Sequence, residues 1–285
     1  MQIEPGTLYV VATPIGNLGD ITQRALQVLK DVNRVCAEDT RNSKKLLTHF
    51  GIQNTLVALH DHNEQSKLDQ LTQWLLEGES LALISDAGTP LISDPGYHLV
   101  QHLQQLNIPV VAIPGASAII AALCVAGLPT DRFVFEGFLP AKSSGRKQAF
   151  TEKTKQTCTQ VYYESSHRIL ASVIDLADVI EPDRKVVIAR ELTKLYEQTF
   201  SGNIAELREW LESDPNHQRG EFVLMIQGAP PTNDTKGIAL EALLVLLIEE
   251  VSVKQAAKLA AQITGESKNT CYKKALALQS GGGVI

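Results

Sequence analysis

Residues 81–96 read LALISDAGTPLISDPG, and this stretch decides the fold class. It opens with apolar residues over the length of a buried strand, which we predict at Ser80–Ser85. The connection that follows, Asp86–Gly96, is dense in glycine, proline and small polar residues, so its backbone can approach a ligand closely. Open α/β sheets hold their ligands in such connections, at the carboxyl ends of their strands.

Strands and helices alternate on both sides of this stretch, from Thr7 to Gly127. Segments such as 20–29 and 64–76 carry apolar residues at helical spacing, and Asp20 is a candidate cap of its helix. This alternation predicts βαβ units, and therefore a parallel sheet with helices on both faces. The remaining strands of the sheet are expected at Leu8–Thr13, Asn33–Ala37, Leu56–Leu59 and Pro109–Ile113.

Two further loops of special composition follow strands of this sheet. Thr13–Asp20 reads TPIGNLGD after the first strand, and Pro114–Ala118 reads PGASA before a very apolar helix at 119–125. Each loop alone fits an ordinary strand-to-helix connection equally well, but three of them at one sheet edge predict a ligand site. Neither loop carries G-x-G-x-x-G, which disfavours a Rossmann oxidoreductase.

The composition of the chain changes after Gly127. Five expected strands there enclose only three helical stretches, which predicts a mixed sheet. A proline-rich linker at Ala229–Asp234 then precedes a helical tail, where 253–263 and 270–278 flank a glycine-containing turn, like a helix-turn-helix. We therefore predict three parts: an N-terminal α/β domain (1–127), a second α/β domain (128–229), and a linker with tail (230–285). The strands of the second domain are expected at Phe133–Phe138, Cys158–Glu164, Lys185–Arg190, Tyr196–Ser201 and Glu221–Gln227.

Composition excludes several classes of protein. A hydrophobic fraction of 44% and a charged fraction of 20% over 285 residues are typical of a folded chain with two cores. No apolar run approaches the ~20 residues of a membrane span, and the first residues do not resemble a signal peptide, so we expect no membrane contact and a cytoplasmic location. Four cysteines without a C-x-x-C pair predict reduced, mostly buried thiols.

The sequence gives no pattern for a metal site. Asp86 and Asp94 lie eight residues apart, but no histidine or glutamate joins them locally, and carboxylates beside proline or glycine commonly form turns or caps. His60 and His62 are expected at the surface. We therefore predict that no metal is bound.

The ordered motifs of the chain resemble those of the ribosomal RNA small subunit methyltransferase I family, within the tetrapyrrole-methylase superfamily. The resemblance covers nearly the whole chain. The first loop of the chain, Thr13–Asp20, departs from the G-x-G-P-G-D pattern of the wider superfamily, and this departure is typical of the small subunit methyltransferase I branch. The motifs are PIGNLGD (14–20), EDTR (38–41), SDAGTPLISDPG (85–96), IPGASA (113–118), FEGFLP (135–140), YYESSHR (162–168) and ARELTK (189–194).

This resemblance implies a two-domain tetrapyrrole-methylase-like fold that binds S-adenosylmethionine between its domains. It implies 2′-O-methylation of a cytidine ribose in small-subunit (16S) ribosomal RNA near the decoding site, by a homodimer acting on the RNA or the 30S subunit. The loops of the N-terminal domain agree with the ligand site that their composition and position predict. The second-domain positions, Glu164 and Leu192, rest on the resemblance alone. The implied donor-binding residues are Pro14, Ile15, Ala87, Gly88, Thr89, Ile92, Ser117, Ala118, Glu164 and Leu192.

The catalytic residue stays open at this stage. A ribose hydroxyl is a weak nucleophile, so a base within hydrogen-bond reach would help it to react. Asp39, Asp86, Asp94 and Glu164 are the candidates, and each of them also fits the role of a cap or an ion-pair partner.

The net charge of −6 repels nucleic acid, so an RNA substrate requires local cations. We place them at Arg41, at Lys142, Arg146 and Lys147 in a presumed basic loop, and at Lys273 and Lys274 in the tail. From Val251 onward the tail has five lysines and one glutamate. Solvated or packed helices are the alternative for each patch. Two other functions stay open: a corrin- or sirohaem-pathway methyltransferase, and a non-catalytic nucleic-acid-binding protein with a cofactor fold.

Overall fold

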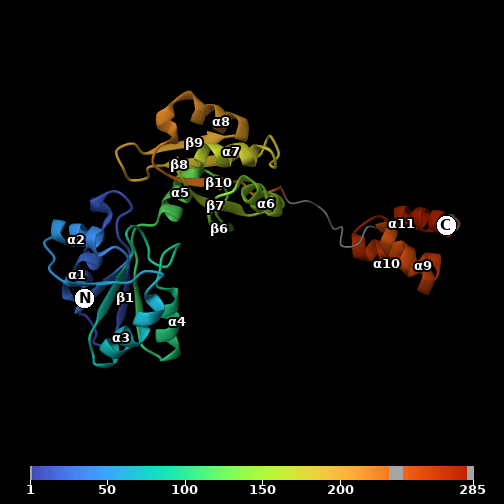
Figure 1. Cartoon of the computed structure of the whole chain (residues 1–285). Helices are drawn as coiled ribbons and strands as arrows, with labels where there is room; N and C mark the ends of the chain where they lie inside the picture. Colours follow the sequence, from blue (N-terminus) through green and yellow to red (C-terminus); the bar gives the residue numbers. More distant parts are fainter. Residues whose placement is uncertain (1, 231–239, 281–285) are drawn as a thin grey trace. The chain divides into compact units, whose positions relative to one another are not determined.

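The computed structural model describes residues 2–230 and 240–280, and it divides into two compact units, Met1–Ala229 and Pro230–Ile285 (Figure 1). Most of the predicted linker, Ala229–Asp234, lies outside the described residues. The larger unit contains two five-stranded sheets. The first sheet is built from residues before Gly127, and the second from residues after it.

The first sheet is parallel, as predicted, with strand order β3-β2-β4-β1-β5. Every predicted strand is present and ends within two residues of its expected bounds. The central strand β4 is buried along its whole length, which explains why it reads as a continuous apolar run. The strands are β1 (Leu8–Val11), β2 (Arg34–Ala37), β3 (Thr55–Ala58), β4 (Leu81–Ile84) and β5 (Val110–Ile113).

Helices cover both faces of this sheet, as predicted. Tyr9 and Val11 of β1 join the core under two helices, while Leu8 joins the core on the opposite face under two others. The predicted cap Asp20 is wrong: it ends a 3-10 turn, and the Thr22 hydroxyl caps the first helix by accepting from Ala25 N–H at 3.1 Å. The helices are α1 (Gln23–Asp31) and α2 (Thr40–His49) on one face, and α3 (Glu64–Leu76) and α4 (Tyr97–Gln105) on the other.

The second sheet is mixed, as predicted, with strand order β6-β7-β10-β8-β9. Its β6 and β7 are parallel, and the remaining neighbours are antiparallel. The strands lie within two residues of their expected bounds. They are β6 (Phe133–Phe138), β7 (Thr159–Ser165), β8 (Val186–Arg190), β9 (Gln198–Gly202) and β10 (Glu221–Ile226).

Strand β10 shows how the second sheet is covered on its two faces. Phe222, Leu224 and Ile226 pack under α6 (Ser143–Lys153), α7 (Ile169–Ala177) and α8 (Ile204–Ser213). The alternate residues, Val223 and Met225, pack instead against α5 (Ala118–Ala126). Thus α5 follows the first sheet in the chain but belongs to the core of the second sheet.

Within residues 240–280, the smaller unit forms a cluster of three helices, α9 (Leu240–Glu250), α10 (Val253–Thr264) and α11 (Lys268–Ser280). The predicted helical hairpin is α10 and α11, and Gly265 ends α10 in the left-handed conformation at φ 73°. Small buried side chains let the helices approach closely; they are Ala256, Ala257, Ala260, Cys271 and Ala275. In the described ranges, no helix is long and apolar enough to span a membrane.

The cysteines among the described residues are free thiols, as predicted, but only two of them are buried. Cys36 and Cys271 lie in cores, Cys158 is half-buried, and Cys124 is exposed on α5. Burial raises the pKa of the Cys36 thiol to about 12, so this group stays protonated in the folded protein.

Candidate active site

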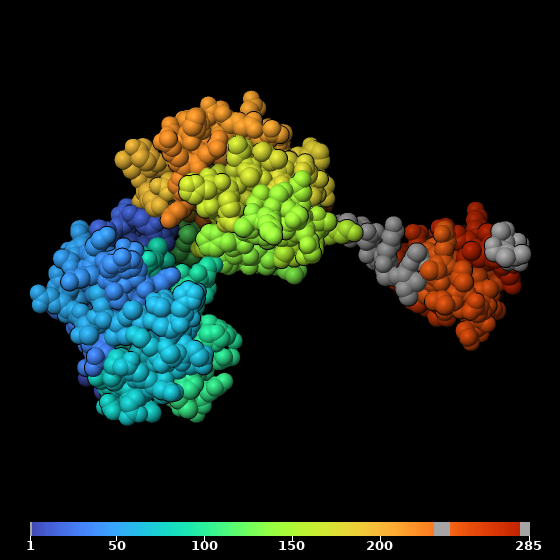
Figure 2. All heavy atoms as spheres, in the orientation of Figure 1, coloured from blue at the N-terminus to red at the C-terminus, as the bar shows by residue number. Residues whose placement is uncertain are grey.

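A cavity of about 500 Å³ lies where the carboxyl edge of the first sheet meets the second sheet. Figure 2 shows the hollow between the lobe built from the first sheet, in blue to cyan, and the lobe built from the second, in green to orange. A cavity of this size is typical of small-molecule sites. The predicted donor residues that line it are Ile15, Ala87, Gly88, Thr89, Ile92, Ser117, Ala118, Glu164 and Leu192. Pro14 is not among the lining residues.

Three loops of the first sheet are tied into one cradle beneath this cavity. Thr13 N–H donates to the Gly88 carbonyl at 2.8 Å, and Gly88 N–H donates back to the Thr13 carbonyl at 3.0 Å. The Thr89 hydroxyl then donates to the Ala116 carbonyl at 3.1 Å. Gly88 has φ +81°, and a Cβ there would lie 3.3 Å from Ile15 Cγ2. A side chain at this position would therefore fill space inside the cradle and strain its backbone.

Strained backbone occurs on both sides of the cavity. Leu91 and Ser93 in the second loop have φ of 74° and 68°. Glu191 and Thr193, which flank the lining residue Leu192, have φ of 51° and 67°. Residues other than glycine rarely adopt this left-handed backbone conformation, and such strain is concentrated at functional sites.

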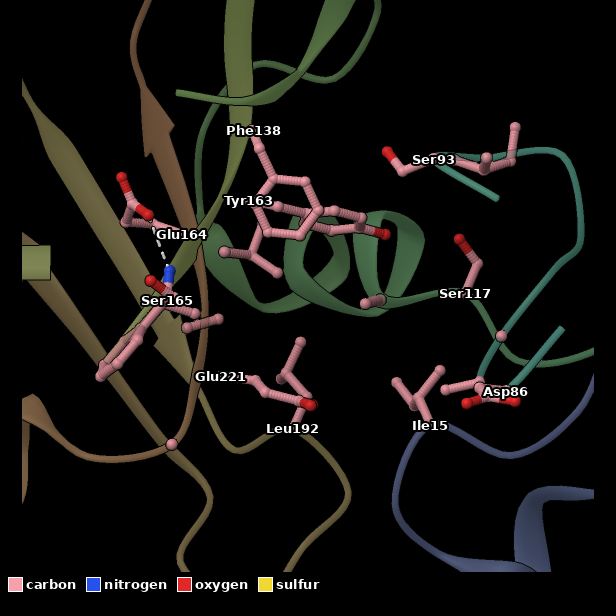
Figure 3. Close-up of a pocket in the computed structure, with 18 of the residues that line it drawn as sticks. Ile15, Asp86, Ser93, Ser117, Phe138, Tyr163, Glu164, Ser165, Leu192 and Glu221 are labelled. Carbon is pink, nitrogen blue, oxygen red and sulfur yellow. Dashed lines mark hydrogen bonds between the residues drawn. The ribbon is translucent and has the colours of Figure 1, made fainter. Parts of the chain in front are cut away.

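The carboxylate of Glu164 is committed to the second domain. Although Glu164 lines the cavity, its side chain is buried and pairs with Arg168 at 2.8 Å. It also accepts from Ser165 N–H at 2.8 Å, drawn as the dashed line in Figure 3, and from the Ser172 hydroxyl at 2.7 Å. With both oxygens occupied by these partners, this carboxylate has a structural role.

Two of the predicted bases in the first domain are also engaged. Asp39 pairs with Arg41 at 2.8 Å, and the hydrogen bonds from Arg41 lower the Asp39 pKa to about 2, which makes it a weak base. Asp86 lines the cavity, but its two oxygens accept from Asp39 N–H at 3.2 Å and from the Asn42 amide at 3.0 Å. Both side chains therefore stabilise the loops.

Asp94 differs from the other candidates. It lines the cavity from the second loop and is half-buried. Burial raises its pKa to about 6, a hydrogen bond from Ser85 works in the opposite direction, and the charges of Asp86 and Asp61 raise it further. Asp94 therefore changes its protonation state near neutral pH, as a general base must.

One predicted phosphate contact is wrong. Arg146 is 5% exposed and pairs with the buried Asp175 at 2.7 Å, while its guanidinium also donates to the Ala141 carbonyl at 2.7 Å. The presumed basic loop is in fact the start of α6. Arg146 points into the protein because this helix must satisfy Asp175 on its neighbour α7. Arg146 therefore does not belong to the RNA-contacting set.

The other predicted cations lie at the surface. Arg41 is exposed over 87% of its side chain and pairs with Asp39, and Lys142 is exposed at the start of α6. Lys147 is partly exposed and pairs with Asp178. In the tail, Lys273 is exposed, whereas Lys274 pairs with Glu241 of α9 at 2.9 Å and thereby links α11 to α9.

The histidines differ from one another. His62 is exposed, but His60 is half-buried beside Asn63, with 3.1 Å between His60 Nε2 and the Asn63 amide nitrogen. Over residues 2–230 and 240–280, no group of three or more histidine, cysteine, aspartate or glutamate side chains is arranged to hold a metal ion.

Comparison with known proteins places this arrangement in a family. A family model described as Tetrapyrrole (Corrin/Porphyrin) Methylases matches residues 7–208, and one described as the RsmI C-terminal HTH domain matches residues 234–279. The chain is 52% identical over 276 residues to the ribosomal RNA small subunit methyltransferase I of Pseudomonas aeruginosa, covering 96% of this chain and 98% of the relative. The chain belongs to the ribosomal RNA small subunit methyltransferase I family.

Other relatives of this family agree. The protein of the same name from Escherichia coli O157:H7 is 50% identical over 274 residues, covering 96% of each chain. Among solved structures, the methyltransferase CobJ has a TM-score of 0.58 at 16% identity, covering 79% of this chain and 95% of its own. The uroporphyrin-III-C-methyltransferase of Thermus thermophilus has a TM-score of 0.54 at 18% identity, covering 78% and 94%. These likenesses confirm the predicted fold class.

The cavity of this ribosomal RNA small subunit methyltransferase I family member also has walls that sequence reasoning missed. Phe138 and Tyr163 line it from β6 and β7, and Gly220–Val223 line it from the start of β10. The two aromatic residues stand inside motifs of the family resemblance, FEGFLP and YYESSHR, so that signal was available. The segment 220–223 carries no motif, and only the sheet order places it at the cavity.

Proposed function

We propose that this chain methylates the 2′-oxygen of a cytidine ribose in small-subunit (16S) ribosomal RNA near the decoding site, acting in the cytoplasm as a homodimer. The observation that carries the proposal is an identity of 52%, over 96% of the chain, to a relative named for methylating small-subunit ribosomal RNA. A corrin- or sirohaem-pathway activity has weaker support. The solved uroporphyrin and cobalt-precorrin enzymes share the fold at only 18% and 14% identity.

The cavity fits the proposed donor, S-adenosylmethionine. When bound, this donor supplies a methyl group carried on a positively charged sulfonium. The cradle of Gly88 and Ile15 leaves room for a ligand against the backbone, and the carboxylates of Asp86 and Asp94 give the cavity negative charge. Ser117, Thr89 and Leu192 would complete the donor site from both sheets.

Asp94 is the proposed general base. It accepts the proton of the ribose 2′-hydroxyl as that oxygen becomes a nucleophile, and the proton comes to rest on the aspartate carboxylate. A pKa of about 6 leaves most of this group ionised at pH 7.5 yet still basic. The remaining work of the enzyme is alignment, which can lower a barrier by roughly 7–11 kcal/mol when the geometry is right.

Mass mapping of small-subunit RNA tests the proposal directly. RNA from a strain lacking this gene should miss one ribose methyl group, and the wild-type gene should restore it. Purified enzyme with tritiated donor should then label that nucleotide in subunits from the deletion strain. A complete methylation pattern in the deletion strain, or transfer to a tetrapyrrole in place of RNA, would overturn the proposal.

We expect Gly88→Ala to weaken S-adenosylmethionine binding by at least about tenfold, measured by calorimetry. The added Cβ meets Ile15 at 3.3 Å and fills part of the cradle, while φ +81° adds a strain of about 1–3 kcal/mol. Gly51→Ala is the matched control, because Gly51 has φ +65° with no atom within 4 Å of the added Cβ. A folded Gly88→Ala protein with normal donor affinity would remove this loop from the site.

The tail is proposed to supply cations for RNA. Residues 230–285 carry six lysines against one aspartate and four glutamates, a net charge of +1. The net charge of the whole chain is −6, so residues 1–229 carry a net charge of −7. The glutamates at 241, 249 and 250 all lie in α9, whereas the lysines within 240–280 are exposed and lie on α10 and α11. Phosphate contacts are therefore expected along the helix-turn-helix and not along α9.

A chain ending after Ala229 should keep donor affinity and lose RNA affinity. Ala229 is a suitable end point, because its N–H donates to the Gln156 carbonyl at 2.7 Å and it is the last residue of the larger unit. In the full chain, Lys273→Ala should reduce the salt slope of RNA binding by roughly 0.7–0.9, with little change in turnover at saturating RNA. Lys274→Ala is the comparison, since Lys274 pairs with Glu241. A folded truncation with unchanged RNA affinity would deny the tail this role.

A further inference from the structure

An aromatic cluster on the second sheet forms one wall of the cavity. Phe135 and Tyr163 stand edge to face with ring centroids 4.8 Å apart, and Phe138 also contacts Tyr163, with ring centroids 5.4 Å apart. Phe138 and Tyr163 both line the cavity. Figure 3 shows these two side chains projecting from the second sheet toward the side of the cavity that carries Ser93 and Ser117.

A bulge in β6 aims Phe138 at this wall. Residues three apart in a regular strand point to opposite faces, so Phe135 and Phe138 should be separated by the sheet. The register of β6 against β7 shifts between these two residues, and Gly137 within the shift has φ +72°. The irregularity turns Phe138 to the face of Phe135 and Tyr163. Bulges commonly re-aim side chains beside active sites.

The wall has aromatic surface left for a ligand. Phe138 is 56% exposed, whereas Phe135 and Tyr163, against which it leans, are half-buried. Tyr163 contacts the Phe138 ring, and Phe138 still lines the cavity with more than half of its surface exposed. A flat apolar ligand group could stack there without displacing any side chain of the core.

The charges of the cavity indicate which ligand group enters. Its charged lining side chains are all acidic, namely Asp86, Asp94, Glu164 and Glu221, and no lysine or arginine is among the lining residues. Glu164 pairs with Arg168 and Glu221 with Lys194, so the negative charge of the cavity comes mainly from Asp86 and Asp94. An RNA phosphate would be repelled here, while an uncharged nucleobase and its ribose would not. Proteins recognise unpaired RNA bases mainly by stacking them on aromatic side chains.

We infer that Phe138, aimed by the β6 bulge and braced by Tyr163, stacks on the nucleobase of the target nucleotide once that base has left its RNA stack. Phe138 is then a substrate-positioning residue that holds the ribose hydroxyl near Asp94. This inference rests on the proposed function, and it assigns the ring to the target base in preference to the adenine of the donor.

The test is methylation kinetics of Phe138→Ala on small subunits from the deletion strain. Stacking of a base on an aromatic side chain predicts a loss of roughly 5- to 100-fold in kcat/KM. The loss should fall mainly on kcat, since cations elsewhere determine RNA affinity, and the salt dependence should stay unchanged. Phe138→Tyr, which keeps a ring, should retain most of the activity. Phe133→Ala is the matched control, because Phe133 is 42% exposed on the same strand and does not line the cavity.

Calorimetry with S-adenosylmethionine separates the possible outcomes. Unchanged donor affinity in a folded Phe138→Ala protein, together with the loss of kcat, supports the inference. Weakened donor affinity would assign the ring to the adenine, and unchanged kinetics would leave it without a role; either result overturns the inference. Equal losses in Phe138→Ala and Phe138→Tyr would overturn stacking. If the wild-type protein labels no small-subunit RNA, the proposed function itself has failed.

Discussion

Asp94→Asn should lower the rate of RNA methylation by about 10²- to 10⁴-fold while S-adenosylmethionine still binds, because the amide cannot accept the proton of the ribose hydroxyl. Single-turnover transfer from tritiated donor measures the chemical step, and calorimetry measures donor affinity. Asp86→Asn is the control in the same cavity. Asp86 already accepts two hydrogen bonds, from Asp39 N–H and the Asn42 side chain, so its effect should be smaller and act through loop stability.

The pH dependence gives an independent reading of the same residue. With an Asp94 pKa of about 6, the wild-type rate should rise through this pH and level off above it. The folded-state pKa is raised from 3.8 to about 6, so folding favours the protonated carboxyl over the carboxylate. The stability that the protonated carboxyl contributes is present below pH 3.8 and is lost as pH rises through about 6. Asp94→Asn should therefore gain stability relative to wild type mainly above pH 6. If Asp94→Asn keeps the full rate or an unaltered pH profile, Asp94 is not the general base, and Asp86 becomes the candidate.

Replacing Arg146 by leucine should lower the free energy of unfolding by about 3–5 kcal/mol, as expected when one partner of a buried ion pair is removed. The Arg146 and Asp175 side chains are only 6% and 7% exposed, and without the guanidinium Asp175 keeps the Ser143 hydroxyl at 2.7 Å and Lys147 at 3.8 Å. Urea denaturation measures the change. The double variant Arg146→Leu with Asp175→Leu should recover much of the loss.

Lys142→Ala is the matched surface control for this variant. Lys142 is exposed at the start of the same helix, so its removal should change stability little. The opposite pattern, with Arg146→Leu stable but weak in RNA binding, would contradict the structural role and restore Arg146 to the RNA-contacting set.

The strands and the cradle could be predicted because local sequence determines them. The apolar run before Asp86 forms a strand that is buried on both faces. The glycine and proline residues after it disfavour both helix and strand, so that segment forms a loop. Parallel pairing then brings the ends of β1, β4 and β5 to one edge. This is why the sequence predicts Ile15, Gly88 and Ser117 together at one site.

The choice among carboxylates could not be predicted, because it depends on partners distant in the chain. Asp86 receives the Asn42 amide from α2, and Arg146 meets Asp175 from α7. Neither pairing leaves a pattern in sequence spacing. The bulge that aims Phe138 is likewise a matter of register between two strands, and FEGFLP alone reads as an ordinary strand end.

The placement of α5 also determines the order in which the chain can be completed during synthesis. The helix ends at Ala126, but β10, against which its apolar face packs, ends 100 residues later at Ile226. At a translation rate of 5–20 residues per second, this face waits roughly 5–20 s for its partner. Strands β7 and β8, which pack against the same face, are made earlier, so Ile119 and Leu123 gain their packing in steps and complete it only when β10 has been synthesised.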